Sequence, residues 1–97
     1  MAKLFSYGTL QKPEVQVEAI GRTVPGTKDI LKGFRKTTIE VNGGAYSILV
    51  PGNEEIIGVV LDVSEKELDE LDIFQTSTYR RVEVTLGSGT KAWVYTQ

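Results

Sequence analysis

Short runs of apolar residues, each ended by glycine, proline or asparagine, extend along most of this chain and predict strands joined by tight turns. The first run lies in residues 4–10 and stops at Gly8, which stands between hydroxyl-bearing side chains. Glycine permits a positive φ and leaves the neighbouring backbone N–H groups uncovered by a Cβ atom. We therefore expect a strand that leads into a loop whose amides can bind a carboxylate or a carbonyl oxygen.

The middle of the chain carries several turn signals. Residues 23–40 contain a Pro-Gly step and a further glycine, which indicate an interrupted strand or a pair of strands. The Asn42-Gly43 step lies between two β-rich runs and predicts a hairpin. We expect residues 51–53 to turn the chain again, and the continuously apolar residues 55–63 to form a central strand.

Two segments predict helices. Ser64 and Glu67 have the spacing of a capping box, and Val63 and Leu68 have that of a hydrophobic staple, so a helix is expected to begin at Ser64. Residues 11–20 have a proline near their start and a glycine directly after them, which is typical of one or two helical turns.

Two further strands follow the second helix. Residues 79–86 alternate between apolar and polar positions, residues 87–89 form a glycine-rich turn, and residues 91–96 complete a hairpin. About six strands around one clear helix predict an α+β fold, with a small, mixed, mostly antiparallel, barrel-like sheet and one or two short flanking helices. The length suits a single domain over residues 1–97.

Composition and charge narrow the classes of partner. The formal net charge is -2, and acidic and basic residues are interspersed, so we expect no nucleic-acid partner. No window approaches the roughly 18 apolar residues of a membrane span, and the N-terminus has no signal-peptide pattern. We therefore expect no membrane partner and a cytoplasmic location.

Cysteine and histidine are both absent from the sequence. Their absence excludes disulfides, Cys/His metal sites, thiol nucleophiles and imidazole bases, and we expect no metal ion. Acid–base chemistry near neutral pH would then need a carboxylate with a raised pKa or, less commonly, a lysine or a tyrosine.

Asp72 is the carboxylate that the helical pattern singles out. It follows Leu68 by four residues and so shares the helix face of Leu68 and Leu71, near the helix C-terminus. Burial and the helix dipole both disfavour the ionised form there, so we expect a raised pKa that suits a general base. The simpler interpretation is that Asp72 only caps a loop amide.

The loop at Gly8 and the strand after the helix also have two interpretations each. Tyr7 and Leu10 either pack into the core around a simple turn or border a binding loop. Tyr79 either packs on an edge strand or brings its hydroxyl to a substrate near Asp72, with one of the following arginines able to pair with a carboxylate.

Five segments together resemble a known family: residues 4–10, 58–63, 68–72, 79–84 and 92–95. In this order and spacing they resemble the γ-glutamylcyclotransferase-like superfamily, in its small AIG2-like branch, over essentially the whole chain. The resemblance implies a barrel-like sheet with flanking helices and a cavity between the Gly8 loop and the helix. It also implies an enzyme, a transferase that acts on a small γ-glutamyl compound, needs no cofactor and releases 5-oxoproline with an amine or amino acid.

The resemblance further implies the roles of individual residues. The family's catalytic residue is a glutamate in a Leu-Asp-x-x-Glu-Gly pattern, and here Asp72 and Ile73 stand at the positions of the glutamate and glycine. Asp72 would therefore be the catalytic base and acid. The substrate-binding residues that the resemblance implies are Tyr7, Gly8, Thr9, Leu10 and Tyr79.

Asp72 is shorter than glutamate by one methylene, about 1.5 Å of reach, and a misplacement of about 1 Å can cost on the order of 10²-fold in rate. Two hypotheses therefore stand side by side. The first is a γ-glutamylcyclotransferase-like enzyme, and the second is a small-ligand-binding or interaction protein that uses the same fold without catalysis. The identity of the leaving amine and the oligomeric state are left open by the sequence.

Overall fold

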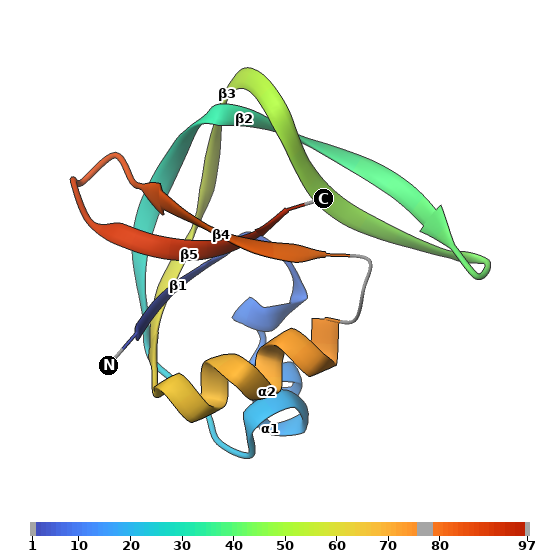
Figure 1. Cartoon of the computed structure of the whole chain (residues 1–97), viewed down its shortest axis with the longest axis vertical. Helices are drawn as coiled ribbons and strands as arrows, with labels where there is room; N and C mark the ends of the chain where they lie inside the picture. The colour runs from blue at the N-terminus through green and yellow to red at the C-terminus, as the bar shows by residue number, and fades with distance from the viewer. Residues whose placement is uncertain (1, 76–78, 97) are drawn as a thin grey trace.

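Within the residues that this computed structural model describes, 2–75 and 79–96, a curled sheet of five strands forms a half-barrel beside two α-helices (Figure 1). The elements in chain order are β1 Ala2–Ser6, a short 3₁₀ helix η1 Thr9–Gln11, α1 Pro13–Ile20, β2 Gly26–Val41, β3 Gly44–Val63, α2 Glu65–Gln75, β4 Arg80–Thr85 and β5 Lys91–Thr96. The strand order is β2-β3-β1-β5-β4, and only the pair of β1 and β5 is parallel. The predicted α+β class with a mixed, mostly antiparallel, barrel-like sheet is confirmed.

Strands β2 and β3 form one long hairpin that curls over the rest of the sheet (Figure 1). Asn42 and Gly43 connect them with φ values of 50° and 80°. Two successive positive φ values match the twist of the flanking strands, which is why an Asn-Gly step favours this turn. The predicted hairpin is therefore confirmed, although its strands, at 16 and 20 residues, are much longer than expected.

The predicted turn at residues 51–53 is wrong, because these residues remain within β3. They lie opposite a β-bulge at Gly33 and Phe34, where Phe34 pairs with both Pro51 and Glu54. Gly33 has a φ of 89°, which suits a bulge. A bulge bends and twists a strand without ending it, so the proline and glycines that predicted a break instead curl one continuous hairpin. This explains why the structure has five strands in its described part, not about six.

The start of α2 has the geometry that its sequence predicts. Ser64 Oγ accepts a hydrogen bond from the Glu67 N–H at 3.1 Å, and Glu67 Oε1 accepts one from the Ser64 N–H at 2.8 Å. The Arg22 guanidinium also donates to both carboxylate oxygens of Glu67, at 2.6 and 2.8 Å. The capping box is therefore confirmed, and its glutamate additionally ties α2 to the segment between α1 and β2.

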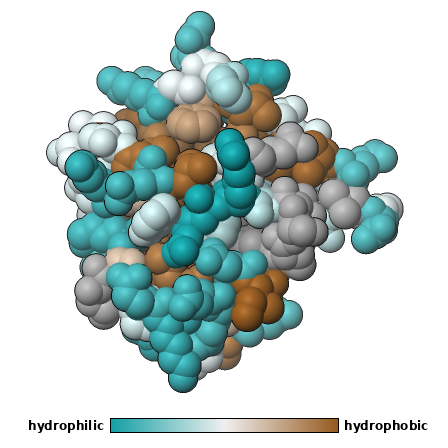
Figure 2. Space-filling view, viewed as in Figure 1, coloured by the Kyte–Doolittle hydropathy of each residue, from teal (hydrophilic) through white to brown (hydrophobic). Residues whose placement is uncertain are grey.

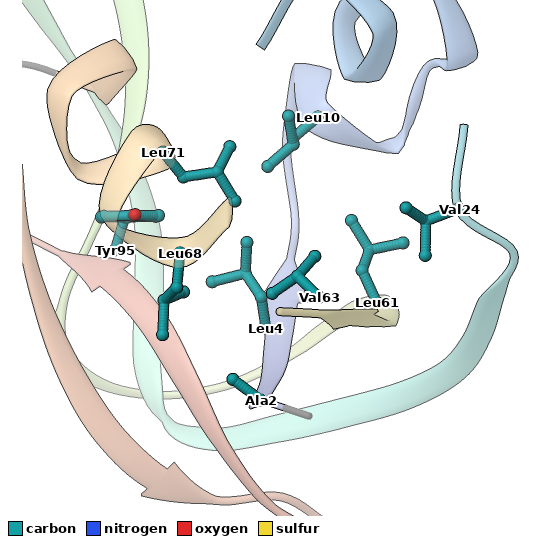
Figure 3. Close-up of a cluster of buried hydrophobic side chains, with 9 residues drawn as sticks. All are labelled: Ala2, Leu4, Leu10, Val24, Leu61, Val63, Leu68, Leu71 and Tyr95. Atoms are coloured by element: carbon teal, nitrogen blue, oxygen red, sulfur yellow. The ribbon is translucent and has the colours of Figure 1, made fainter. Parts of the chain in front are cut away.

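The helices cover an apolar cluster on one face of the sheet. Leu68 and Leu71 project from α2 toward Leu4 and Val63, as Figure 3 shows. The members of the cluster are Ala2, Leu4, Leu10, Val24, Leu61, Val63, Leu68, Leu71 and Tyr95. Val63 and Leu68 are both buried in it, as the predicted hydrophobic staple requires.

The predicted helical turns in residues 11–20 are also confirmed, as α1. Gly21 ends this helix with a φ of 78° and donates its N–H to Val17 O at 2.9 Å. None of the helices in the described part of the chain has the length and apolar character needed to cross a membrane.

Strand β1 is buried on both faces of the sheet. Leu4 packs in the cluster under the helices, whereas its neighbour Phe5 packs in a second cluster with residues of β2, β3 and β5. Gly58 of β3 faces this strand so closely that a Cβ atom there would lie 2.3 Å from the Ser6 carbonyl oxygen and 2.7 Å from the Phe5 ring. Only glycine fits this position without a shift of the central strand.

We therefore expect Gly58→Ala to destabilise the protein by about 1–3 kcal/mol, because β1 must move to accept the methyl group. The measurement is urea denaturation followed by circular dichroism. Gly8→Ala is the matched control, since a Cβ at Gly8 would meet no atom within 4 Å, and its effect should stay within about 0.5 kcal/mol. Equal denaturation midpoints for the two variants would contradict the close approach at Gly58.

The Arg22 and Ser64 contacts hold the pKa of Glu67 down, to about 2. A lowered pKa stabilises the fold above the ordinary glutamate value, and this contribution is lost as the pH falls from about 4.5 toward 2. Glu67→Gln should therefore be less stable than the natural protein at pH 7, and the difference should shrink across that interval. Denaturation midpoints between pH 7 and pH 2 test this, with the exposed Glu65→Gln as control. A difference that does not change with pH would contradict the assignment.

Candidate functional site

A cavity of about 180 Å³ opens between the loop after β1 and the long β2–β3 hairpin. Its described lining comes from β1 and its loop, from β3, from Tyr79 and from β5. The lining residues are Leu4, Phe5, Ser6, Tyr7, Gly8, Leu10, Ala45, Tyr46, Ser47, Tyr79 and Tyr95. The resemblance implied a cavity against the helix, but none of these residues belongs to α2, so the wall opposite the loop is formed by the hairpin.

The predicted substrate-binding residues largely meet at this cavity. Tyr7, Gly8, Leu10 and Tyr79 all line it, although they come from opposite ends of the sequence. Thr9 begins η1 between them, and its side chain lies outside the described residues. The structure therefore brings together the loop and Tyr79.

Neither a positive φ nor a lack of space for a Cβ atom explains the glycine at position 8. It is not among the glycines with a positive φ, and a Cβ atom on it would meet nothing within 4 Å. The expectation that Gly8 turns the chain through a positive φ is wrong. Gly8 lines the cavity, and the open space beside it leaves room for a ligand to approach the backbone.

The loop is held in place by bonds to its carbonyl groups. Gln11 donates to Gly8 O from its backbone N–H at 3.2 Å and from Nε2 at 3.1 Å, and Lys36 Nζ donates to Tyr7 O at 3.3 Å. Among the described residues, no acceptor is found for the Gly8 N–H, which is therefore available to a ligand. Such amides can stabilise a carboxylate or a developing negative charge on a carbonyl oxygen.

Gln16 is a positioning residue that sequence analysis missed. It is 3% exposed, its Nε2 donates to Leu10 O at 3.0 Å, and its Oε1 accepts from the Val24 N–H at 2.7 Å. One buried amide thus satisfies two backbone groups and fixes the loop against the segment before β2. The sequence gave no signal of this role, because both partners of Gln16 are backbone groups of residues six and eight positions away.

Three tyrosine hydroxyls at the cavity donate to oxygen atoms of the protein. Tyr7 donates to Tyr95 O at 2.7 Å, Tyr79 to Ser47 O at 2.8 Å, and Tyr95 to Asp72 Oδ1 at 2.8 Å. Burial raises the pKa of all three, and the Asp72 carboxylate raises that of Tyr95 further. These hydroxyls are therefore protonated at neutral pH, so they act as hydrogen-bonding groups and a tyrosinate base is excluded.

Asp72 stands behind Tyr95 as seen from the cavity and is not among the lining residues. Its side chain is 38% exposed, and its Oδ2 lies 3.2 Å from a guanidinium nitrogen of Arg81. The Arg81 guanidinium in turn lies 4.6 Å from the centre of the Trp93 ring. Asp72 is therefore only partly buried, unlike Leu68 and Leu71 on the same helix, and it reaches the cavity through the Tyr95 hydroxyl.

The end of α2 is apolar and exposed. Figure 2 shows hydrophobic atoms there beside the residues drawn in grey, and Ile73 is 80% exposed.

The family's Leu-Asp-x-x-Glu-Gly pattern can be placed on this helix in two ways. When the pattern begins at Leu68, Asp72 stands at the position of the glutamate and Ile73 at that of the glycine. The same Leu-Asp-x-x-Glu pattern can also begin at Leu71 and Asp72, which places Gln75 at the position of the glutamate. The Gln75 side chain lies outside the described residues, but its chemistry is known: a neutral amide cannot take up a proton near pH 7.

Comparison with known proteins gives consistent matches. The model of the family "Gamma-glutamyl cyclotransferase, AIG2-like" matches residues 4–97. AIG2-like protein C of Arabidopsis thaliana is 36% identical over 87 residues, which cover 86% of this chain and 49% of that protein. AIG2-like protein A of the same plant is 32% identical over 83 residues, which cover 84% and 49%. This chain thus spans about half the length of the curated relatives that it matches.

Two solved structures share the fold. A solution structure of a protein from Arabidopsis thaliana has a TM-score of 0.83 at 24% identity, and covers 98% of this chain and 61% of that chain. A crystal structure of an uncharacterized protein from Pyrococcus horikoshii has a TM-score of 0.72 at 21% identity, and covers 99% and 77%. At these identities the likeness is evidence of the fold alone.

The two bonds of Gln16 lead to a prediction. Gln16→Leu keeps the approximate volume but leaves Leu10 O and the Val24 N–H buried without their partner, at about 1–3 kcal/mol for each group. We expect a total loss of about 2–6 kcal/mol in the free energy of unfolding, and faster hydrogen exchange at the Val24 amide. Gln11→Leu is the control, because its Nε2 bond to Gly8 O is exposed. Slow exchange at Val24 in Gln16→Leu would contradict this role.

Proposed function

This chain belongs to the γ-glutamyl cyclotransferase, AIG2-like family, and on that premise we propose that its cavity converts a γ-glutamyl compound to 5-oxoproline and a free amine or amino acid. The observation that carries the proposal is the loop after β1, whose Gly8 and Leu10 line the cavity and whose Gly8 N–H has no protein acceptor among the described residues. A small-molecule substrate is the partner, and no cofactor takes part. The cytoplasmic location stays a prediction.

The reaction forms one bond and breaks one. The substrate's α-nitrogen attacks its own γ-carbonyl carbon, the new C–N bond closes a five-membered ring, and the C–N bond to the leaving amine breaks. The α-ammonium releases two protons as it becomes the ring amide, and the leaving nitrogen gains one as it departs and a second in solution. The loop amides would stabilise the negative charge that develops on the γ-carbonyl oxygen.

In this proposal Asp72 is the proton-transfer residue and Tyr95 connects it to the substrate. The Tyr95 hydroxyl donates to Asp72 Oδ1, so in this proposal it would pass its own proton to Asp72 as it takes one from the substrate's ammonium, and it stays neutral throughout. Tyr7 and Tyr79 would shape the site, since their hydroxyls are held by protein carbonyl groups. The short aspartate thus acts through a hydroxyl, which supplies the reach that it lacks by comparison with glutamate.

A second candidate function is binding without turnover. The pairing of Asp72 with Arg81 favours it, because a carboxylate engaged by a guanidinium and a hydroxyl has a sufficient structural role. Placement of Gln75 at the position of the family's glutamate favours it as well. The protein would then hold a γ-glutamyl compound or 5-oxoproline on the loop amides and leave it unchanged.

The test is to incubate the purified protein with γ-glutamyl amino acids and with γ-glutamyl-ε-lysine, and to measure 5-oxoproline by mass spectrometry. We expect turnover that falls by about 10²-fold or more in Asp72→Asn and falls clearly in Tyr95→Phe. Asp69→Asn, at an exposed position of the same helix, is the control and should keep full activity.

No 5-oxoproline from any substrate would reject the enzyme. In that case, binding of γ-glutamyl compounds measured by calorimetry would support the second candidate. Turnover that appears only in Gln75→Glu would show that the glutamate's position is 75 and that Asp72 is not the catalytic residue.

A further inference from the structure

The described lining of the cavity contains all the tyrosines of the chain and no charged side chain. The sequence has 4 tyrosines, and Tyr7, Tyr46, Tyr79 and Tyr95 are all in the described lining. That lining contains no lysine, arginine, aspartate or glutamate. The described part of the wall therefore offers no charged side chain to a ligand.

The charges just outside the wall do not favour a cation either. Lys36 Nζ donates to Tyr7 O at 3.3 Å and lies 6.0 Å from the centre of the Tyr7 ring. Asp72 lies behind Tyr95 and is already paired with Arg81. Lys36 thus holds a positive charge against a lining residue and has no ion-pair partner among the described residues, so it attracts a substrate carboxylate and repels a second ammonium group near Tyr7.

Aromatic rings can themselves bind a cation, and this effect must be weighed. A cation–π contact at an exposed ring improves binding by only about twofold to fivefold. The Lys36 ammonium is already near the face of Tyr7. A charge that enters without a partner also loses hydration, and this cost exceeds the gain. The rings therefore act as an apolar surface.

Tyr46 is the ring placed to contact the part of a ligand that extends out of the cavity. It lines the cavity and is nevertheless 49% exposed, whereas Tyr7 and Tyr95 are buried. It belongs to β3 near the tip of the long hairpin, next to Ser47, whose carbonyl accepts the Tyr79 hydroxyl. This arrangement offers an aromatic face at the rim, fixed to the wall opposite the loop amides.

We propose that this site selects γ-glutamyl amides whose leaving amine is uncharged and apolar, and that this group packs on Tyr46. The inference rests on the proposed function only in that the γ-glutamyl half of the ligand is taken to bind at the Gly8 loop. The proposal predicts that γ-glutamyl amides of lysine or of a diamine bind poorly at this site, and that γ-glutamyl amides of an alkyl or aryl amine bind well.

The test uses two ligands that differ in one terminal group. γ-Glutamyl-n-pentylamide ends in a methyl group. γ-Glutamyl-(5-aminopentyl)amide has the same five-carbon chain and carries an ammonium group at its end. We expect the neutral amide to bind the full chain at least about tenfold more tightly in calorimetry. Tyr46→Ala should weaken the neutral ligand by about tenfold and reduce the ratio, whereas Tyr46→Phe should preserve both. Equal or tighter binding of the ammonium ligand would overturn the proposal.

The same experiment separates this inference from the proposed function. Tighter binding of the neutral amide without release of 5-oxoproline would reject catalysis and support the selectivity. Release of 5-oxoproline from both amides with equal kcat/KM would support catalysis and reject the selectivity. Failure of both ligands to bind would reject both, provided that circular dichroism shows the natural protein to be folded.

Discussion

The close approach of β3 to β1 at Gly58 is the constraint on which the rest of the structure depends. Because no side chain separates the two strands there, β1 lies in the middle of the sheet with apolar clusters on both of its faces. A strand fixed on both faces and both edges delivers its C-terminal loop to one place. The position of the Gly8 amides, and with it the cavity, follows from this packing.

Local signals in the sequence predicted those elements whose cause is local. The capping box at Ser64 and Glu67 and the Asn42-Gly43 turn both depend on residues within a few positions, and both were confirmed. The glycine and proline residues near position 51 gave the same signal as a turn, yet they lie at a bulge. Whether these residues form a turn or a bulge depends on the opposite strand, where Gly33 and Phe34 form the bulge. The sequence of one segment does not contain that information.

The site illustrates the same limit. The loop and Tyr79 were identified because they belong to contiguous motifs, and the resemblance gave them a purpose. Tyr46 and Tyr95 were not among the predicted site residues, because nothing in their own segments indicates that a hairpin and the last strand bring them to one cavity. Partners that are supplied by distant strands, such as the Tyr95 hydroxyl on Asp72, require the fold before they can be identified.

The long strand β2 stands at an edge of the sheet, where it pairs only with β3 among the described strands. Ile30 is paired on this side, because its carbonyl oxygen accepts the Gly87 N–H at 2.7 Å, but the rest of a 16-residue edge strand is a template on which a second chain could add by strand pairing. Strand β2 carries several charged side chains, including Lys28, Asp29, Lys32 and Arg35. A hairpin long enough to wall a cavity is thus compatible with a protein that resists assembly into fibres, because its own charges oppose the addition of another strand.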